Sequence, residues 1–150
     1  MTLVFAAAPV AGKPETASPP GDANVFILRD KAEPLLVKVE VEIDGLFRTR
    51  LGNKSFTAVR VEPGLSFVRI HWPGEDRAGD LVAPLVVKEG EPLFFELTGS
   101  VQARGSSVAR LKLSHLPGFE ALDPDTAPAR IAACCRYRAA EAIDRAAKSD

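Results

Sequence analysis

Residues 35–72, LLVKVEVEIDGLFRTRLGNKSFTAVRVEPGLSFVRIHW, carry the pattern that decides the fold. From Val37 to Ile43 apolar residues alternate with Lys and Glu, which is the period of a strand with one buried face. Asp44-Gly45 and Pro63-Gly64 are dipeptides that favour tight reversals of the chain. The stretch is therefore predicted to fold as a β-meander.

The register of the first hairpin follows from the need to bury one face of the strand. A two-residue turn at Asp44-Gly45 sets Val41 opposite Arg48, which places a charge in the buried face. With Leu46 also in the connection, apolar residues of the first strand face uncharged residues of the second. We therefore expect a three-residue connection and the pairs Ile43–Phe47, Val41–Thr49, Val39–Leu51, Glu42–Arg48 and Glu40–Arg50.

The remaining apolar runs complete an all-β pattern. Across Pro63-Gly64, a connection with an even number of residues pairs Val59 with Val68 and Thr57 with Ile70. Further strands are predicted at residues 24–29, 81–87, 93–97 and 108–113, with 81–87 and 93–97 paired around Glu89-Gly90-Glu91. About eight antiparallel strands of this length fit a β-sandwich better than a single sheet.

After Leu116-Pro117-Gly118 the apolar residues change to a helical period. Thr126 or Asp125 can cap a helix and Pro128 suits its first turn, so a helix is predicted over about residues 126–148. Its apolar face consists of Ile131, Cys135, Ala139, Ala142 and Ala146. Because this face is rich in Ala, we expect the helix to dock on the sandwich, over a sheet face that carries Phe56 and Phe67.

Residues 1–22 form a segment apart from the single domain predicted for residues 23–150. Leu3 to Ala11 is a short apolar run that ends in small residues, as an export signal does, although it lacks a basic start and is too short to span a bilayer. Lys13 to Asp22 is rich in Pro, Ser and Gly, as linkers are. A remnant of an export signal predicts a periplasmic or secreted protein, and the alternative is an N-terminal tail or edge strand of a cytoplasmic one.

Charge and motifs argue against several classes of function. Nineteen Lys and Arg against twenty Asp and Glu give a net charge of −1, which is no electrostatic footprint for nucleic acid. The single Trp and single Tyr argue against a platform for stacking bases. The sequence has no Gly-x-Ser-x-Gly elbow, phosphate loop or dinucleotide fingerprint, so we predict no cofactor, and it has no segment suited to an integral membrane span.

The order of these features resembles a bacterial family known as domain of unknown function 2846. The resemblance covers residues 23–122 and rests on NVFILR, a strand ending in Asp-Gly, a short strand ending near Gly52, VRVEPGLSFVRI and VVKEGEPLFFEL. It implies an exported or lipid-anchored β-sandwich, and this chain departs from the family in lacking an N-terminal Cys for a lipid. The family has no known catalytic residues, so the resemblance implies none here.

Cys134 and Cys135 are the only cysteines. Neighbouring side chains on a helix point about 100° apart, so one can pack inward while the other faces solvent, and a bond between them would break the helix. We expect Cys135 to be buried and Cys134 to be a reactive thiol. A redox or metal role is the alternative, which no Cys-x-x-Cys spacing supports.

His71 and His115 are the only histidines. Neither His-x-His nor His-Glu-x-x-His spacing is present, and a lone histidine is most often a hydrogen-bonded surface residue. We therefore predict no metal site.

If consecutive strands alternate in direction, their connections fall at two ends of the sandwich. The tight turns at 44–46, 62–64 and 89–91 share one end, and residues 30–34, 52–54, 72–80 and 99–107 share the other. Because binding residues concentrate on long loops, we predict a binding site at the second end, with the candidate residues Trp72, Arg77, Arg104, Asn53 and Lys54. The alternative is that these loops are solvated and that Trp72 packs as a lid on the core.

Together these features predict a non-catalytic, extracytoplasmic module that binds a protein or a component of the cell envelope. The rival is a hydrolase-type or metal-dependent enzyme whose site carries no known motif. A pocket with converging titratable groups favours the enzyme, whereas sheet faces and loops favour the module.

Overall fold

A computed structural model describes residues 18–74, 79–104 and 112–143, with side chains for all of these except 102–104 and 112–114. Ten strands and one helix form in these ranges. In chain order they are β1 (Val25–Arg29), β2 (Val39–Ile43), β3 (Phe47–Leu51), β4 (Ser55–Val59), β5 (Gly64–His71), β6 (Leu81–Val87), β7 (Leu93–Arg104), β8 (Lys112–Ala121), α1 (Ala127–Cys134), β9 (Arg136–Tyr137) and β10 (Glu141–Ala142).

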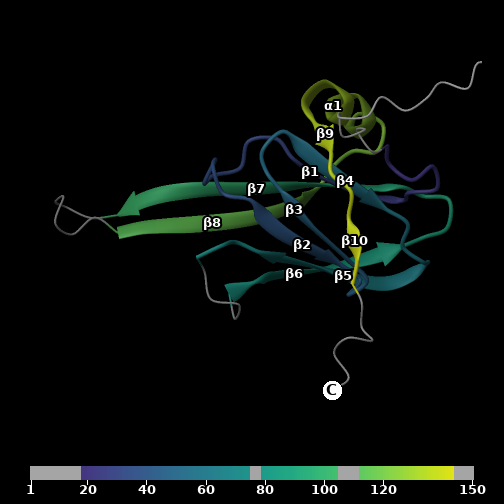
Figure 1. The fold of residues 1–150 in the computed structure, drawn as a ribbon, viewed down its shortest axis with the longest axis horizontal. Coiled ribbons are helices and arrows are strands. Elements are labelled where there is room, and N and C mark those ends of the chain that lie inside the picture. Colours follow the sequence, from purple (N-terminus) through teal and green to yellow (C-terminus); the bar gives the residue numbers. More distant parts are fainter. Residues whose placement is uncertain (1–17, 75–78, 105–111, 144–150) are drawn as a thin grey trace, which may run out of the picture.

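The strands form two mostly antiparallel sheets, which confirms the predicted β-sandwich (Figure 1). One sheet has the order β8-β7-β1-β4-β9 and the other the order β10-β3-β2-β5-β6. We refer to them as the first and the second sheet. Two pairs in the first sheet, β1 with β7 and β4 with β9, are parallel.

The core lies in two layers, one on each side of the first sheet. The larger cluster fills the space between the sheets with inward side chains such as Ile27, Val41 and Ile70. The smaller cluster lies on the outer face of the first sheet, where Ile131 of α1 packs on Phe56 and Phe94. This second layer explains why all five residues of β4 are buried, whereas β2 has a buried residue only at every second position.

The register predicted for the first hairpin is confirmed. Asp44, Gly45 and Leu46 connect β2 to β3, and all five predicted pairs occur, including Glu40 opposite Arg50 and Glu42 opposite Arg48. Asp44 and Gly45 have φ values of 54° and 61°, the left-handed conformation that this dipeptide tolerates. The requirement for an uncharged buried face was therefore enough to fix the connection.

The predicted pairing of residues 55–61 with 65–71 is wrong, and residues 35–72 are not a continuous meander. β4 pairs with β1 in the first sheet, whereas β5 pairs with β2 and β6 in the second. Pro63-Gly64 therefore carries the chain from one sheet to the other. The pairing of 81–87 with 93–97 fails in the same way, because β6 joins β5 while β7 joins β1 and β8.

β7 and β8 pair with each other, which was not predicted, and both strands are longer than expected. β7 continues through residues 99–104, which were expected to be a loop, and β8 begins at Lys112 and includes Pro117 and Gly118, which were expected to end the strands. β8 is an edge strand, and edge strands are where proline is tolerated in a sheet. Taking the Pro and Gly residues as the end of the strand therefore gave the wrong bounds for β8.

The helix predicted for residues 126–148 is wrong beyond Cys134, and residues 144–148 lie outside the described ranges. Cys135 is extended, and the next residues add β9 to β4 and β10 to β3. Pairing with an open strand edge satisfies backbone groups that a helix satisfies internally, so tertiary pairing overrides helix propensity here. α1 docks on Phe56 as expected, but Phe67 lies on the second sheet and is 51% exposed.

Candidate functional site

The strand registers place the connections at two ends of the sandwich, as alternating strands require. Residues 44–46, 60–63 and 88–92 lie at one end, which we call the turn end. Residues 30–38, 52–54 and Trp72 lie at the other, which we call the loop end. β7 and β8 extend beyond the loop end (Figure 1).

Arg29, the last residue of β1, organises the loop end. Its side chain is fully buried, and its guanidinium donates hydrogen bonds to the backbone carbonyl oxygens of Ala32, Pro34, Val37 and Leu51. Burial lowers the pKa of Arg29 from its ordinary value, because desolvation disfavours the charged form. These bonds fix the path of residues 30–38 around the side chain.

Trp72 packs into the same region and faces the interior. It is 3% exposed, its ring lies edge-on to His115 with 4.3 Å between centroids, and the Arg29 guanidinium lies 5.1 Å from its ring centre. The geometry matches the alternative in which Trp72 is a lid on the core. Of the other candidates, Arg77 lies outside the described residues, and Arg104 has a described backbone at the end of β7 but no described side chain.

Asn53 joins the two connections of the loop end. Its side-chain oxygen accepts a hydrogen bond from the Ala32 amide at 2.8 Å, and its side-chain nitrogen donates to the Leu35 carbonyl oxygen at 3.0 Å. The next residue, Lys54, has a φ of 57°, and this left-handed residue completes the reversal that takes the chain from β3 to β4. Asn53 is thus a scaffold residue that places Lys54 beside the loop.

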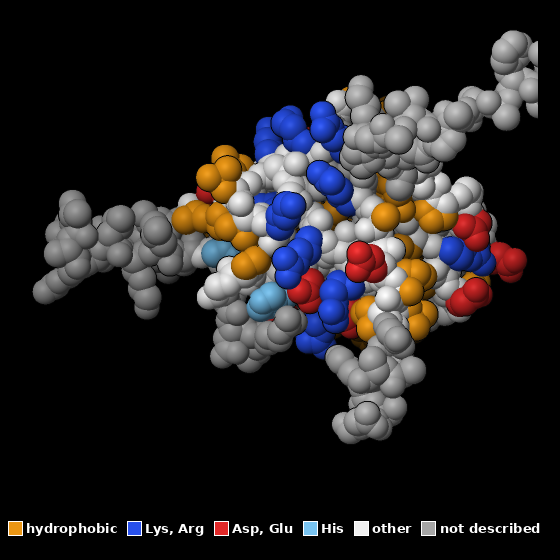
Figure 2. All heavy atoms as spheres, viewed as in Figure 1, with side chains coloured by type: hydrophobic (Ala, Val, Ile, Leu, Met, Phe, Trp, Pro, Cys, Tyr) orange, Lys and Arg blue, Asp and Glu red, His pale blue; other side chains and the backbone are white. Residues whose placement is uncertain are grey.

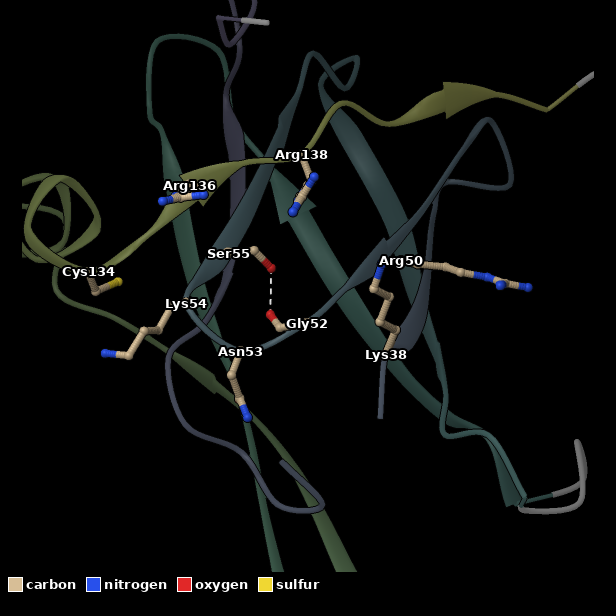
Figure 3. Close-up of a pocket in the computed structure, with 9 residues that line it drawn as sticks. All are labelled: Lys38, Arg50, Gly52, Asn53, Lys54, Ser55, Cys134, Arg136 and Arg138. Atoms are coloured by element: carbon tan, nitrogen blue, oxygen red, sulfur yellow. Dashed lines mark hydrogen bonds between the residues drawn. The ribbon is translucent and has the colours of Figure 1, made fainter. Parts of the chain in front are cut away.

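A groove of about 440 Å³ opens beside Asn53 and Lys54 (Figure 3). Five of the residues that line it are cationic, and none is acidic. The lining residues are Lys38, Arg50, Gly52, Asn53, Lys54, Ser55, Cys134, Arg136 and Arg138. We call this set the basic groove.

The segment after α1 supplies two of these cations. β9 pairs in parallel with β4, and the amides of Arg136 and Arg138 donate to the carbonyl oxygens of Lys54 and Phe56 at 2.9 and 2.8 Å. Side chains of an extended segment alternate, so Arg136 and Arg138 share one side while Tyr137 lies on the other. Tyr137 packs on Phe56 with 5.6 Å between ring centroids, and its burial raises its pKa. Packing of the tyrosine therefore turns both arginines toward the groove.

The second sheet supplies the opposite wall. Lys38 and Arg50 line the groove, and Arg50 also lines a neighbouring hollow of about 270 Å³ with Arg48 and Glu141. Figure 2 shows Lys and Arg side chains in a band across the face that β9 and β10 cross. Arg48 lies 3.7 and 3.8 Å from carboxylate oxygens of Glu40 and Glu42, so acidic partners moderate the charge at that end of the band.

Acidic residues also border the groove behind Lys54. The Lys54 ammonium lies 4.0 Å from a carboxylate oxygen of Asp30, and Asp30 lies 3.8 Å from Arg130. Arg130 makes two hydrogen bonds to Glu96 of β7, and these bonds raise the pKa of its guanidinium. Through this network α1 is tied to β7 and to the end of β1, so the helix that precedes β9 is held in place.

Cys134 lines the groove but is not a free thiol. It is joined to Cys135 by a disulfide bond, and the structure has no free cysteine in its described residues. The prediction of a reactive Cys134 and a separate buried Cys135 is therefore wrong. Because α1 ends at Cys134, the bond forms where the backbone is no longer helical, which removes the objection that it would break a helix.

The two histidines have structural partners. His71 Nδ1 lies 2.6 Å from an oxygen of Asp80, and His115 Nε2 lies 2.9 Å from the Glu33 carbonyl oxygen. Within the described ranges, no three His, Cys, Asp or Glu residues come together in a way that could hold a metal ion. The described residues also form no helix with the length and hydropathy needed to cross a membrane.

Of the predicted site residues, Asn53 and Lys54 come together in the groove with Cys134. Lys38, Arg50, Arg136 and Arg138 were missed. The signal for the two arginines was present, since Arg136-Tyr137-Arg138 alternates with the period of a strand as well as fitting the polar face of a helix. Comparison of the chain with protein-family models, with curated proteins and with solved structures found no match.

Proposed function

We propose that this protein is a non-catalytic, extracytoplasmic binding module whose basic groove binds the oxyanion groups of an anionic ligand, such as phosphates. The observation that carries the proposal is the lining of the groove, in which five cations border a volume of about 440 Å³ and no lining residue is acidic. Arginine binds phosphate and carboxylate oxygens in bidentate geometry, and lysine binds them as a point charge. The groove thus provides several donors for one extended anion.

Two further features support this proposal. The cations are carried on strands or on backbone fixed by hydrogen bonds, which reduces the cost of ordering a site. The lining includes neither a histidine nor a carboxylate that could act as general base, which favours binding over the rival hydrolase.

The location outside the cytoplasm is part of the same proposal. Disulfide bonds persist in oxidising compartments and are rare in the cytosol. The bond between Cys134 and Cys135 supports an exported protein, together with the apolar run of residues 3–11.

Titration with inorganic tripolyphosphate tests the proposed function. We expect calorimetry at low ionic strength to detect binding that weakens as salt is added, because exposed charges are screened. The double variant Arg136→Glu with Arg138→Glu is expected to bind about a hundredfold more weakly, since each lost charge-assisted contact costs roughly tenfold or more.

The matched control reverses two exposed cations at the turn end, Arg60→Glu with Lys88→Glu, which changes the net charge equally. It should bind tripolyphosphate nearly as well as the unmodified protein. Equal losses in the two double variants would show that only net charge matters and would contradict a defined groove. Release of orthophosphate during the titration would favour the rival hydrolase.

A further inference from the structure

Two adjacent leucines stand out at the loop end. Leu35 is 58% exposed and Leu36 is 99% exposed, although leucine is among the residues most often buried. Leu116, at 49% exposure, lies in β8, and the neighbouring His115 bonds to the backbone at Glu33 of the same loop. The loop end therefore presents apolar side chains to solvent.

The exposed leucines lie on a backbone that is tied down on both sides. The carbonyl oxygens of Pro34 and Val37 accept hydrogen bonds from the buried Arg29 guanidinium, and Asn53 donates to that of Leu35. We call Leu35 and Leu36 the leucine tip. The sandwich holds the backbone of this tip in place, with the Leu36 side chain outside the core. Such a fixed apolar projection is typical of a contact surface.

The leucine tip lies at the rim of the basic groove. Asn53, which holds Leu35, is a lining residue of the groove, and Lys38 follows Leu36 by two positions and lines it as well. Figure 2 shows hydrophobic side chains beside the band of Lys and Arg, on the side from which β7 and β8 extend. Apolar projection and cationic surface are therefore neighbours on one end of the molecule.

The two ends of the sandwich differ in charge. The turn end carries the exposed Glu62, Glu89 and Glu91, with Arg60 and Lys88 among them. The net charge of −1 therefore hides an uneven distribution, in which the basic groove lies toward the opposite end. An anionic surface attracts the five cations of the groove more strongly than the turn end, where three glutamates stand against two cations, and this favours an approach with the leucine tip toward the surface.

We propose that the loop end docks on a membrane that contains anionic lipids, with Leu35 and Leu36 inserted at the level of the headgroups and the basic groove in contact with lipid phosphates. This inference rests on the proposed function, because it names the source of the oxyanions. Each cation close to an anionic bilayer strengthens binding about fivefold, and inserted apolar side chains add to it. A single weak signal gives only marginal binding, and an apolar insertion combined with a basic surface binds a membrane more stably.

Sedimentation with vesicles tests the inference. We expect the full chain to bind vesicles of phosphatidylcholine with roughly a third phosphatidylglycerol, and to bind pure phosphatidylcholine at least tenfold more weakly. The variant Leu35→Ser with Leu36→Ser should lose at least tenfold in binding to the anionic vesicles and keep its affinity for tripolyphosphate. The control Leu65→Ser with Val86→Ser removes two exposed apolar side chains that face each other across β5 and β6, and it should bind as the unmodified protein does.

A fluorescence measurement covers the case in which a serine variant does not fold. Tryptophan introduced by Leu36→Trp should shift to shorter wavelength when anionic vesicles are added, and tryptophan introduced by Leu65→Trp should not. Binding of tripolyphosphate without binding of anionic vesicles would overturn the membrane inference and leave the proposed function standing. Vesicle binding that survives the leucine change, or that is equal on both lipids, would also overturn it. Loss of binding to both probes in Arg136→Glu with Arg138→Glu supports a shared groove.

Discussion

The two ends of the sandwich are built by different means. At the turn end, Asp44-Gly45-Leu46 is fixed by local backbone conformation, with φ values of 54° and 61° at Asp44 and Gly45, and the one long-range side-chain clamp described there joins Asn24 to the backbone of Val61. At the loop end, residues 30–38 are fixed from a distance by the buried side chain of Arg29 and by Asn53. A connection held by side chains can present a chosen surface, whereas a tight turn has little freedom. The difference explains why the basic groove and the exposed leucines occur at the loop end.

Removing the Arg29 side chain should have the largest effect on the stability of the loop end. Arg29→Met leaves four backbone carbonyl oxygens without their donor in a buried site, and we expect a loss of about 3–5 kcal/mol in the free energy of unfolding. Urea denaturation followed by circular dichroism measures the loss. The control Arg60→Met, at an exposed position of the turn end, should change stability by about 0.5 kcal/mol or less. Similar losses in the two variants would show that Arg29 does not organise the fold.

A methyl group at Gly99 should disturb the loop end by a different route. A Cβ at this position lies 2.6 Å from the Glu33 carbonyl oxygen and 3.0 Å from His115 Nε2, so the loop or the strand has to move. We expect Gly99→Ala to lower the free energy of unfolding by about 1–3 kcal/mol, as measured by thermal denaturation. Gly21→Ala is the control, because nothing lies within 4 Å of its Cβ. A neutral Gly99→Ala would contradict the close packing of residues 30–38 on β7.

The smallest expected effect concerns the ion pairs behind the groove. Glu96→Gln weakens the contact to Arg130, whose side chain is partly exposed. We therefore expect the free energy of unfolding, measured by chemical denaturation, to fall by about 1 kcal/mol or less. At the turn end, Glu89→Gln should have no measurable effect. A loss of several kcal/mol on changing Glu96 would show that the network carries much more of the fold than surface ion pairs usually do.

The parts of the fold that sequence predicts are those that depend on neighbouring strands. The pairs between β2 and β3 follow from alternation and charge, because a slip by one residue buries Arg48. Alternation cannot choose a partner for Val59, since both Val68 and the β1 residue Val25 satisfy the same pattern. The structure pairs Val59 with Val25, and β4 is buried on both faces because α1 covers the outer one. That choice depends on contacts between distant segments.

The residues of the candidate site, too, could be predicted only where they do not depend on contacts between distant segments. Asn53 and Lys54 were predicted from the position of their loop, and they do line the groove. Arg136 and Arg138 were assigned to the polar face of a helix, because the segment lies among alanines. Whether it is helix or strand is decided by the open edge of β4, which no local pattern of residues 126–148 reveals.

Titration of the isotopically labelled protein with tripolyphosphate, followed by the backbone amide resonances, tests most directly the claim that the basic groove is the binding site. The account predicts shifts concentrated at Asn53, Lys54 and residues 136–138, with the amides of the turn-end residues 60–62 and 88–91 unchanged. Shifts centred on the turn end, or spread evenly over exposed Lys and Arg residues, would contradict it.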